Sequence, residues 1–210
     1  MGPGAVIEPG AVIGVRTGRD IPDLSLTIGA RAKIRSGTIL YLGSRIGERF
    51  ETGHYTIVRE ENTIGNGVQI WSHSVVDYGC TIGNDVHLHS NVYVAQYSIL
   101  EDGVFVAPGT VLLNDPHPGC AFSRQCMRGP TLCRNVCVGG GCTLLPMIKI
   151  GEGAIIGGGS VVTRDIPAGA VAYGVPARVH GRREDLKCRT GHTLMAYPPE
   201  RAQPRKKGRR

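Results

Sequence analysis

An aliphatic residue recurs at every sixth position through most of this 210-residue chain. Steps of six from Ile28 to Leu112 meet Ile, Leu or Val at every position except Thr52. The same period returns over residues 132–162, and Ile7 and Ile13 start it near the N-terminus. A period of six fits neither a helix nor simple strand alternation. It predicts one inward-pointing side chain per short strand, with a corner before the next strand.

Three such strands would close one triangular coil of about 18 residues, and stacked coils would bury a continuous aliphatic column. The sequence therefore predicts an all-β protein, a parallel β-helix of seven to eight coils. The 31 glycines and the few aromatic residues support this prediction, because they suit many tight corners and a core without bulky rings. The period alone leaves the winding hand open, and another kind of β-solenoid remains an alternative.

Two interruptions break the period. A short one covers residues 15–27, and the longer one is a loop insertion over residues 113–131. Because a solenoid leaves its period where a loop has a task, the insertion is the first place to look for a functional site.

The period ends after Val162, and the rest of the chain is expected to close the structure. We expect a β-helix domain over residues 1–180, an extension with a short helix near residues 183–187, and a basic disordered tail. The extension covers residues 181–197, and the tail covers residues 198–210.

The net charge of +7 is concentrated in residues 200–210, which hold six Lys or Arg and one Glu. The remaining chain carries only +2, so we read the tail as solvated and expect no nucleic-acid partner. No apolar run approaches the roughly 20 residues of a membrane helix. The N-terminal residues lack the basic and apolar regions of a secretion signal, which favours a cytoplasmic protein.

Residues 150–178, IGEGAIIGGGSVVTRDIPAGAVAYGVPAR, resemble the closing coils of hexapeptide-repeat acyltransferases. Residues 82–118 resemble more narrowly those members that N-acetylate nucleotide-linked amino sugars. The resemblance spans about residues 28–180 and implies a left-handed β-helix, a homotrimer with active sites between neighbouring prisms, and acetyl-CoA as co-substrate. The chain departs from the family at Gly140 and Gly141, where members commonly have Ala and Asn.

This resemblance also implies where acetyl-CoA binds. Its pantetheine arm would follow the glycine-rich corners of the last coils, where a small side chain lets a thin ligand approach the backbone. Two arginines would meet its phosphates. The cofactor-binding candidates are Gly139, Gly157, Gly158, Arg164, Ala172 and Arg178.

Acyl transfer to an amine or hydroxyl needs a base and a means of aligning two substrates. The insertion contains Asn114-Asp115-Pro116-His117, and we predict His117 as the base or an acceptor contact. By resemblance, Asn114 matches a substrate-binding Asn of the amino-sugar subgroup. Asp115, in the same cluster, and His54, in a turn that resembles one of the family, are predicted to bind the acceptor.

Seven cysteines without a short CxxC pair favour free thiols, and we predict no metal. A zinc site remains an alternative, as does a disulfide that pins the insertion. The zinc ligands would be Cys120, Cys126, Cys188 and His192.

Two other functions stay open. A γ-type carbonic anhydrase shares this fold and holds zinc with three histidines across a trimer interface, a pattern that His73, His87 and His89 match poorly. A non-catalytic scaffold would leave Asn114 and His117 without a role. We expect an acetyltransferase that acts on an amino or hydroxyl group of a sugar.

Overall fold

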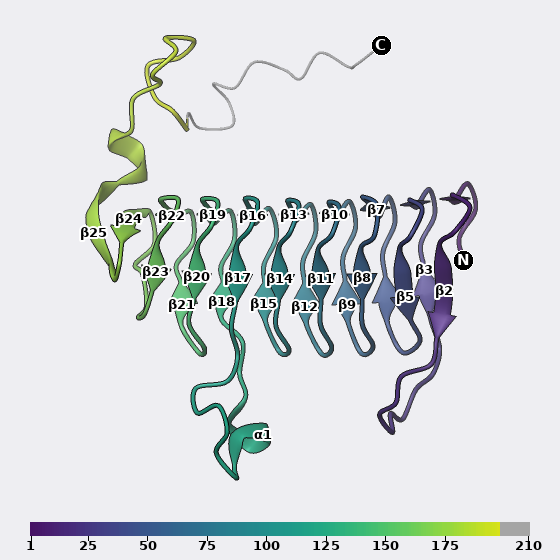
Figure 1. Ribbon diagram of the computed structural model, residues 1–210. Coiled ribbons are helices and arrows are strands. Elements are labelled where there is room, and N and C mark those ends of the chain that lie inside the picture. Colours follow the sequence, from purple (N-terminus) through teal and green to yellow (C-terminus); the bar gives the residue numbers. More distant parts are fainter. Residues whose placement is uncertain (198–210) are drawn as a thin grey trace.

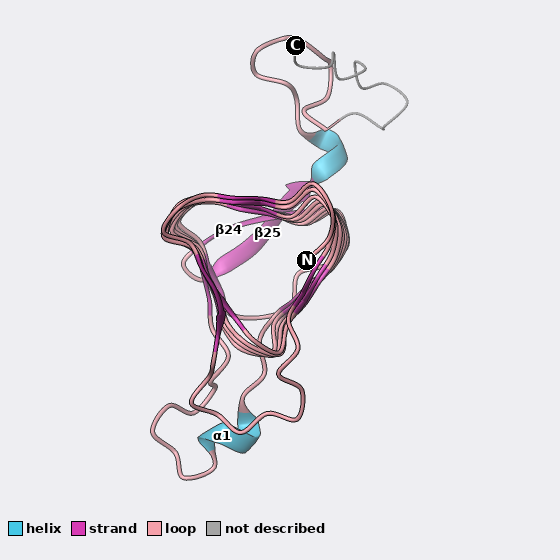
Figure 2. Ribbon diagram, turned by 90° about the vertical axis from the view of Figure 1, so that its right-hand side faces the viewer, coloured by secondary structure: helices cyan, strands magenta, loops and turns pink. Residues whose placement is uncertain are grey.

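The computed structural model describes residues 1–197, so the tail expected over residues 198–210 lies outside the described residues. The chain forms a triangular prism with a parallel sheet on each side (Figures 1 and 2). One of the three sheets, named sheet B below, has eight strands, one per coil, and this number confirms the predicted seven to eight coils. The strands facing the viewer in Figure 1 run downward while the coils advance from right to left, so the winding is left-handed.

The strands are short and are named here by sheet. Sheet A comprises β1 (Val6–Ile7), β4 (Lys33–Ile34), β7 (Glu51–Thr52), β10 (Gln69–Ile70), β13 (His87–Leu88), β16 (Phe105–Val106), β19 (Cys137–Val138), β22 (Ile155–Ile156), β24 (Ala170–Gly174) and β25 (Ala177–Arg182). Sheet B comprises β2 (Val12–Val15), β5 (Ile39–Tyr41), β8 (Ile57–Val58), β11 (Val75–Val76), β14 (Tyr93–Val94), β17 (Val111–Leu112), β20 (Thr143–Leu144) and β23 (Val161–Val162). Sheet C comprises β3 (Thr27–Ile28), β6 (Arg45–Ile46), β9 (Thr63–Ile64), β12 (Thr81–Ile82), β15 (Ile99–Leu100), β18 (Thr131–Leu132) and β21 (Lys149–Ile150).

The six-residue anchors form the core. Every anchor from Ile28 to Val162 is buried, and full burial of one such aliphatic side chain contributes about 1.5–3 kcal/mol. Thr52, the polar anchor, is also buried: its Oγ1 lies 3.0 Å from that of Thr38 and accepts a hydrogen bond from the backbone N–H of Arg35. The one break in the aliphatic period is thus hydrogen-bonded rather than exposed.

Each coil has three corners, which we name by the sheets they join. In one central coil the A–B corner is residues 89–92, the B–C corner residues 95–98 and the C–A corner residues 101–104. Both interruptions leave the prism at the B–C corner (Figure 1). The early loop, residues 16–26, joins β2 to β3, and the insertion, residues 113–130, joins β17 to β18 and contains the one-turn helix α1 (Ser123–Cys126).

The C-terminal end of the prism is closed by a hairpin that the six-residue period did not predict. β24 continues sheet A beside β22 and then pairs antiparallel with β25. Ala170, Ala172 and Ala177 of this hairpin are buried and cover the last coil. The extension follows with a single 3-10 turn, η1 (Arg183–Asp185), in the place where a short helix was expected. Among residues 1–197, no helix has the length and apolar character needed to cross a membrane.

Candidate active site

Asn114 holds the first end of the insertion against the prism at the B–C corner. Its side chain is buried, and Nδ2 donates a hydrogen bond of 2.6 Å to Oε1 of Gln96 one coil earlier. Its backbone carbonyl accepts a bond of 2.8 Å from the N–H of Arg128, close to the other end of the insertion. Asn114 therefore fixes the root from which the predicted base projects.

His117 lies in a tight turn beyond this root. Oδ1 of Asp115 accepts a bond of 2.9 Å from the backbone N–H of His117, and Oδ2 of Asp115 accepts one from Ser123. Asp115 thus shapes the loop, although the sequence suggested an acceptor contact. His117 is exposed, and its imidazole makes no hydrogen bond within residues 1–197. An exposed, unbonded imidazole is available to take a proton from a bound acceptor.

The glycine candidates lie at another corner, A–B, where one column of residues changes in size along the prism. The residue after each sheet A anchor stacks on the next, from Trp71 and His89 through Ala107 to Gly139 and Gly157. Ala107, Gly139 and Gly157 thus form a line of small residues about 10 Å long, because they span two coil spacings of about 4.8 Å. We call these three residues the small-residue track.

Aromatic side chains stand at both ends of the small-residue track. The rings of Trp71 and His89 stack 6.1 Å apart at one end, and those of Tyr173 and His180 stack 3.8 Å apart at the other. Nδ1 of His89 is enclosed and has no hydrogen-bond partner among residues 1–197.

Two of the predicted glycines are required by packing. A Cβ on Gly139 would lie 2.5 Å from the backbone nitrogen of Gly158, and one on Gly157 would lie 2.8 Å from Cβ of Tyr173. Gly158 is exposed, and a Cβ there would lie 3.3 Å from the carbonyl oxygen of Gly140 and 3.7 Å from its backbone nitrogen. At Gly139 and Gly157, therefore, the packing of neighbouring coils requires a residue without a side chain.

The other predicted contacts are scattered. Ala172 is buried in the core, and its backbone carbonyl accepts a hydrogen bond from the N–H of Gly157. Arg178 pairs with Tyr173 in the closing hairpin, near the end of the small-residue track, whereas Arg164 is exposed at the B–C corner. His54 lies at the A–B corner but several coils earlier, and its Nδ1 is 2.8 Å from Oγ of Ser36.

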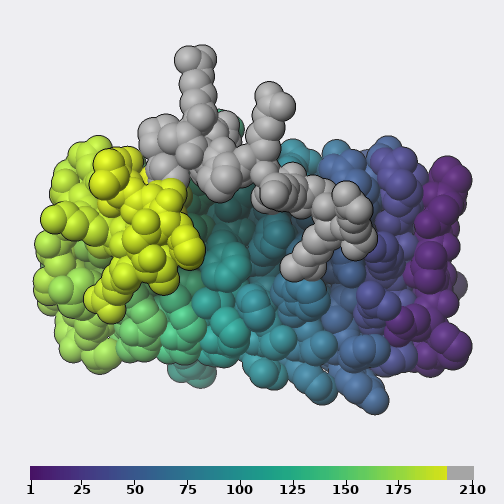
Figure 3. Space-filling view, turned by 90° about the horizontal axis from the view of Figure 1, so that it is seen from above, coloured from purple at the N-terminus to yellow at the C-terminus, as the bar shows by residue number. Residues whose placement is uncertain are grey.

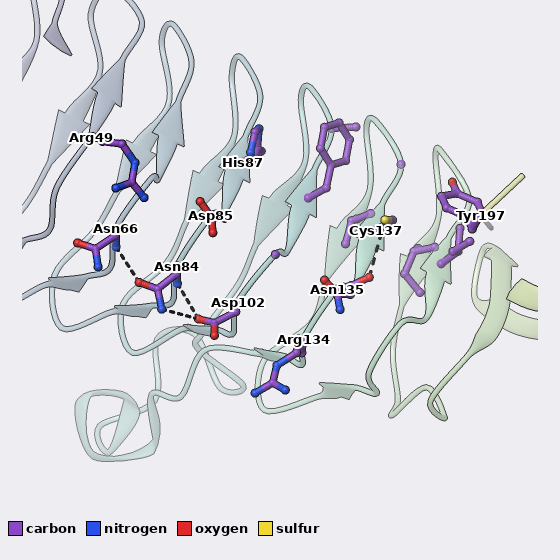
Figure 4. A pocket seen from close by; sticks show the side chains of 17 residues that line it. Arg49, Asn66, Asn84, Asp85, His87, Asp102, Arg134, Asn135, Cys137 and Tyr197 are labelled. Atoms are coloured by element: carbon purple, nitrogen blue, oxygen red, sulfur yellow. Dashed lines mark hydrogen bonds between the residues drawn. The ribbon is translucent and has the colours of Figure 1, made fainter. Parts of the chain in front are cut away.

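A groove crosses the outer face of sheet A and reaches the small-residue track at Ala107 and Gly139 (Figure 4). Arg49 and Arg134 line it on the side of the C–A corner, and Tyr197 of the extension covers its far end. Figure 3 shows the extension, in yellow, standing over the last coils on this side. The groove could not be predicted from the sequence, because its lining residues lie on or beside six successive strands of sheet A, β7 to β22, and in the extension.

Within one chain, the two groups of candidates lie on opposite edges of sheet B (Figure 2). Between them, the outward side chains of sheet B are almost all apolar and only partly covered. They are Val12, Ile39, Ile57, Val75, Tyr93, Val111, Thr143 and Val161. Most outward residues of sheet C are polar instead: Thr27, Arg45, Thr63, Thr81, Thr131 and Lys149, with Ile99 as the exception.

A chain of polar side chains that the sequence analysis missed runs along the B–C corner. Asp77, buried, accepts hydrogen bonds from Tyr93 and Gln96, and Gln96 in turn contacts Asn114. Burial, then the neighbouring Asp77 carboxylate, raises the pKa of Tyr93 to about 12. The sequence spacing could have predicted the contact between Gln96 and Asn114, because 18 residues, one full coil, separate them.

The same chain of polar side chains continues through Arg59 to the fully buried carboxylate of Glu60. Arg59 lies 3.5 Å from Asp77 and contacts Glu60 through two nitrogens, at 2.9 and 3.0 Å. Arg19 and Thr17 of the early loop bind the same carboxylate. Burial opposes ionisation of Glu60, but these bonds, led by those of Arg59, lower its pKa from 4.5 to about 2.

The four candidate zinc ligands cannot share one ion. Cys120 and Cys126 lie in the insertion, whereas Cys188 and His192 lie in the extension at the opposite side of the prism (Figure 1). In the described part of the chain, no three His, Cys, Asp or Glu side chains are grouped to hold a metal. All seven cysteines are free thiols, so no disulfide pins the insertion.

The repeat, the three-sided prism and its closing hairpin define a hexapeptide-repeat β-solenoid. No family model matches the chain. It is 38% identical over 88 residues to a serine acetyltransferase of Synechococcus elongatus, covering 42% of this chain and 34% of that protein. It is 36% identical over 95 residues to the galactoside O-acetyltransferase of Escherichia coli, covering 41% and 45%. The matched segments thus span less than half of these relatives.

A solved serine acetyltransferase from Brucella abortus, in complex with coenzyme A, overlaps half of this chain and 40% of its own, with a TM-score of 0.43 and 26% identity. The similar proteins from Synechococcus elongatus and Escherichia coli are both named acetyltransferases, and the similarity to them is confined to segments of 88 and 95 residues.

Proposed function

We propose that this protein is an acetyl-CoA-dependent acetyltransferase that works as a homotrimer. The observation that carries the proposal is the position of its two half-sites. The insertion with His117 and the small-residue track lie on opposite edges of one apolar sheet face, so neither corner is a complete site in a single chain. Homology to acetyltransferases supplies the reaction class.

A three-fold arrangement would unite the half-sites. With sheet B of each prism turned toward the axis, the B–C corner of one copy lies beside the A–B corner of the next. The partly covered aliphatic side chains of sheet B, such as Ile57, Val75 and Val111, would then be buried between copies. Each cleft would combine the insertion of one copy with the small-residue track of its neighbour.

The chain's own residues would have divided roles in such a cleft. Acetyl-CoA would supply the activated acyl group, and the residues of the small-residue track would hold its thin arm. Its phosphates would meet arginines near the hairpin and the groove, with Arg178 and Arg134 as candidates. Asn114 would hold the acceptor, and His117 would take the proton from its attacking nitrogen or oxygen and pass a proton to the leaving thiolate.

The proposed acceptor is a sugar carrying an amino or hydroxyl group, with a nucleotide-linked amino sugar as the first candidate. Two observations support this choice: the resemblance of residues 82–118 to amino-sugar N-acetyltransferases, and the similarity to a protein named a galactoside O-acetyltransferase. A cytoplasmic location, where acetyl-CoA is available, fits this proposal.

A coenzyme A release assay tests it, with a panel of nucleotide-linked amino sugars, free sugars, serine and small amines. We expect turnover with at least one sugar, and strong loss in Asn114→Ala and in His117→Ala. His192→Ala, another exposed histidine outside the proposed cleft, is the matched control. Absence of turnover across the panel together with no acetyl-CoA binding by calorimetry would overturn the proposal, and full activity of both variants would overturn the site.

A further inference from the structure

Asp77 is the fixed point of the polar chain below the insertion. Its Oδ2 accepts hydrogen bonds from the hydroxyl of Tyr93, at 2.8 Å, and from Nε2 of Gln96. Its Oδ1 accepts a bond of 2.8 Å from the backbone N–H of Tyr78 and lies 3.5 Å from Arg59. A carboxylate paired with a guanidinium can only accept hydrogen bonds, so every group that faces it must donate.

This constraint sets the direction of two amides in succession. Gln96 must turn its NH₂ group toward Asp77, which leaves its Oε1 facing Asn114. Asn114 must then turn its own NH₂ group toward Gln96, where the bond is 2.6 Å long. The orientation of Asn114 thus follows from the charge on Asp77, two hydrogen bonds away.

The free end of Asn114 is its carbonyl oxygen. Oδ1 has no hydrogen-bond partner within residues 1–197. Among those residues, the enclosed side-chain atom without a partner is Nδ1 of His89, so Oδ1 of Asn114 is not enclosed. Oδ1 thus keeps some exposed area in a side chain that is otherwise buried, and it lies three residues before His117.

We propose that Asp77 and Gln96 are positioning residues that keep Asn114 presenting a carbonyl oxygen, never an NH₂ group, to the acceptor. The acceptor group recognised there must then carry a hydrogen, as an amine, an ammonium or a hydroxyl does. This inference rests on the proposed acetyltransferase function. It names the residues that would make the proposed site prefer acceptor groups that donate a hydrogen bond.

Asp77→Asn reverses the polarity in a defined way. The backbone N–H of Tyr78 and the Arg59 guanidinium both face the Oδ1 position, so the remaining carbonyl stays there and the new NH₂ group takes the place of Oδ2. Gln96 must then present its oxygen to position 77, and Asn114 must present its NH₂ group outward. We expect the acceptor KM to rise about tenfold, the effect of roughly one lost hydrogen bond, with the KM for acetyl-CoA unchanged.

A second substitution should restore the original direction. In Asp77→Asn combined with Gln96→Glu, the new carboxylate accepts from position 77 with one oxygen and from Asn114 with the other. We expect the acceptor KM of this double variant to return to within about twofold of the parent value. Tyr93→Phe, which removes another bond to Asp77 but keeps the carboxylate, is the matched control and should leave both KM values unchanged.

A substrate-free measurement separates this proposal from the proposed function. In the parent protein the Asn114 side-chain amide protons should exchange slowly with water, because they point into the buried chain, and in Asp77→Asn they should exchange at least tenfold faster, as NMR can measure. Unchanged exchange in Asp77→Asn, or a double variant as impaired as the single one, would overturn the relay. Failure of every acceptor in the panel would overturn only the enzyme assignment.

Discussion

The early loop and the insertion leave the prism at the same corner, yet they are anchored very differently. The early loop is held by side chains along its length. Arg19 binds Glu60 at 3.1 Å and Glu61 at 2.7 Å, and its guanidinium lies 3.7 Å from the centre of the Tyr78 ring. Ile21 is buried.

The insertion is held at its root and little beyond it. Asn114 and Arg128 join its two ends, but α1 contains no buried residue and Phe122 is 67% exposed. The early loop therefore packs against the prism. The insertion instead exposes polar and apolar side chains, such as His117 and Phe122, to the surroundings. This difference fits a second loop that finds its contacts on a substrate and a neighbouring copy.

The largest effect that separates the loops should come from His117→Ala. Loss of a positioned base costs about 10² to 10⁴ in rate, so we expect kcat for the acetyl transfer to fall by at least 100-fold. The melting temperature should not change, because His117 is exposed and its imidazole makes no hydrogen bond within residues 1–197. Steady-state kinetics and a thermal melt check this. A fall in melting temperature with retained kcat would reverse the roles assigned to the two loops.

Glu60→Gln should have the opposite signature, a loss of stability of about 3 kcal/mol, the scale of breaking a buried ion pair. The parent protein should show the matching pH dependence. The pKa of Glu60 is lowered from 4.5 to about 2, so its contribution is complete above pH 4.5 and is lost as pH falls toward 2. Urea unfolding between pH 2 and 7 measures the free energy of unfolding of the parent protein and of Glu60→Gln. If this free energy fell equally steeply with pH in the two proteins between pH 4.5 and 2, the assignment would be contradicted.

The fold and the two loops differ in how far the sequence could predict them. Each short strand buries one aliphatic side chain, so such residues recur every six positions and anchors such as Leu88 and Ile150 could be predicted one by one. The breaks in this period located both loops. The closing hairpin could not be found this way, because antiparallel pairing between β24 and β25 abandons the period of six.

Polar partners were harder to predict, because they depend on which side chains meet across coils. The insertion drew attention to Asn114 and His117, which stay predictions, but Asp77 and Gln96 look like ordinary corner residues until the coils are stacked. Glu60 was missed for the same reason, since its partner Arg19 comes from the early loop, 41 residues earlier. That the candidate groups lie on opposite edges of sheet B also requires the three-dimensional structure.

Limited digestion with trypsin should show an intermediate effect, a difference in cleavage rate between the two loops. We expect cleavage after Arg124, exposed in α1, to be at least about tenfold faster than cleavage after Arg19, whose side chain binds two carboxylates. Mass spectrometry of the first fragments identifies the sites. Glu60→Gln should make the early loop nearly as sensitive as the insertion, whereas equal rates in the parent protein would show that its ion pairs do not restrain it.

The smallest effect should come from the insertion's cysteines. Cys120→Ser and Cys126→Ser, alone or together, should change the free energy of unfolding by less than about 0.5 kcal/mol, because neither residue is buried or disulfide-bonded. A chelator should leave kcat and the melting temperature unchanged. Lys187→Ser, at the far side of the prism, is a matched control for a solvent-facing substitution. A chelator-sensitive melting temperature that the double variant abolishes would mean that the insertion gains a metal between copies, and that its weak anchoring holds only for the single chain.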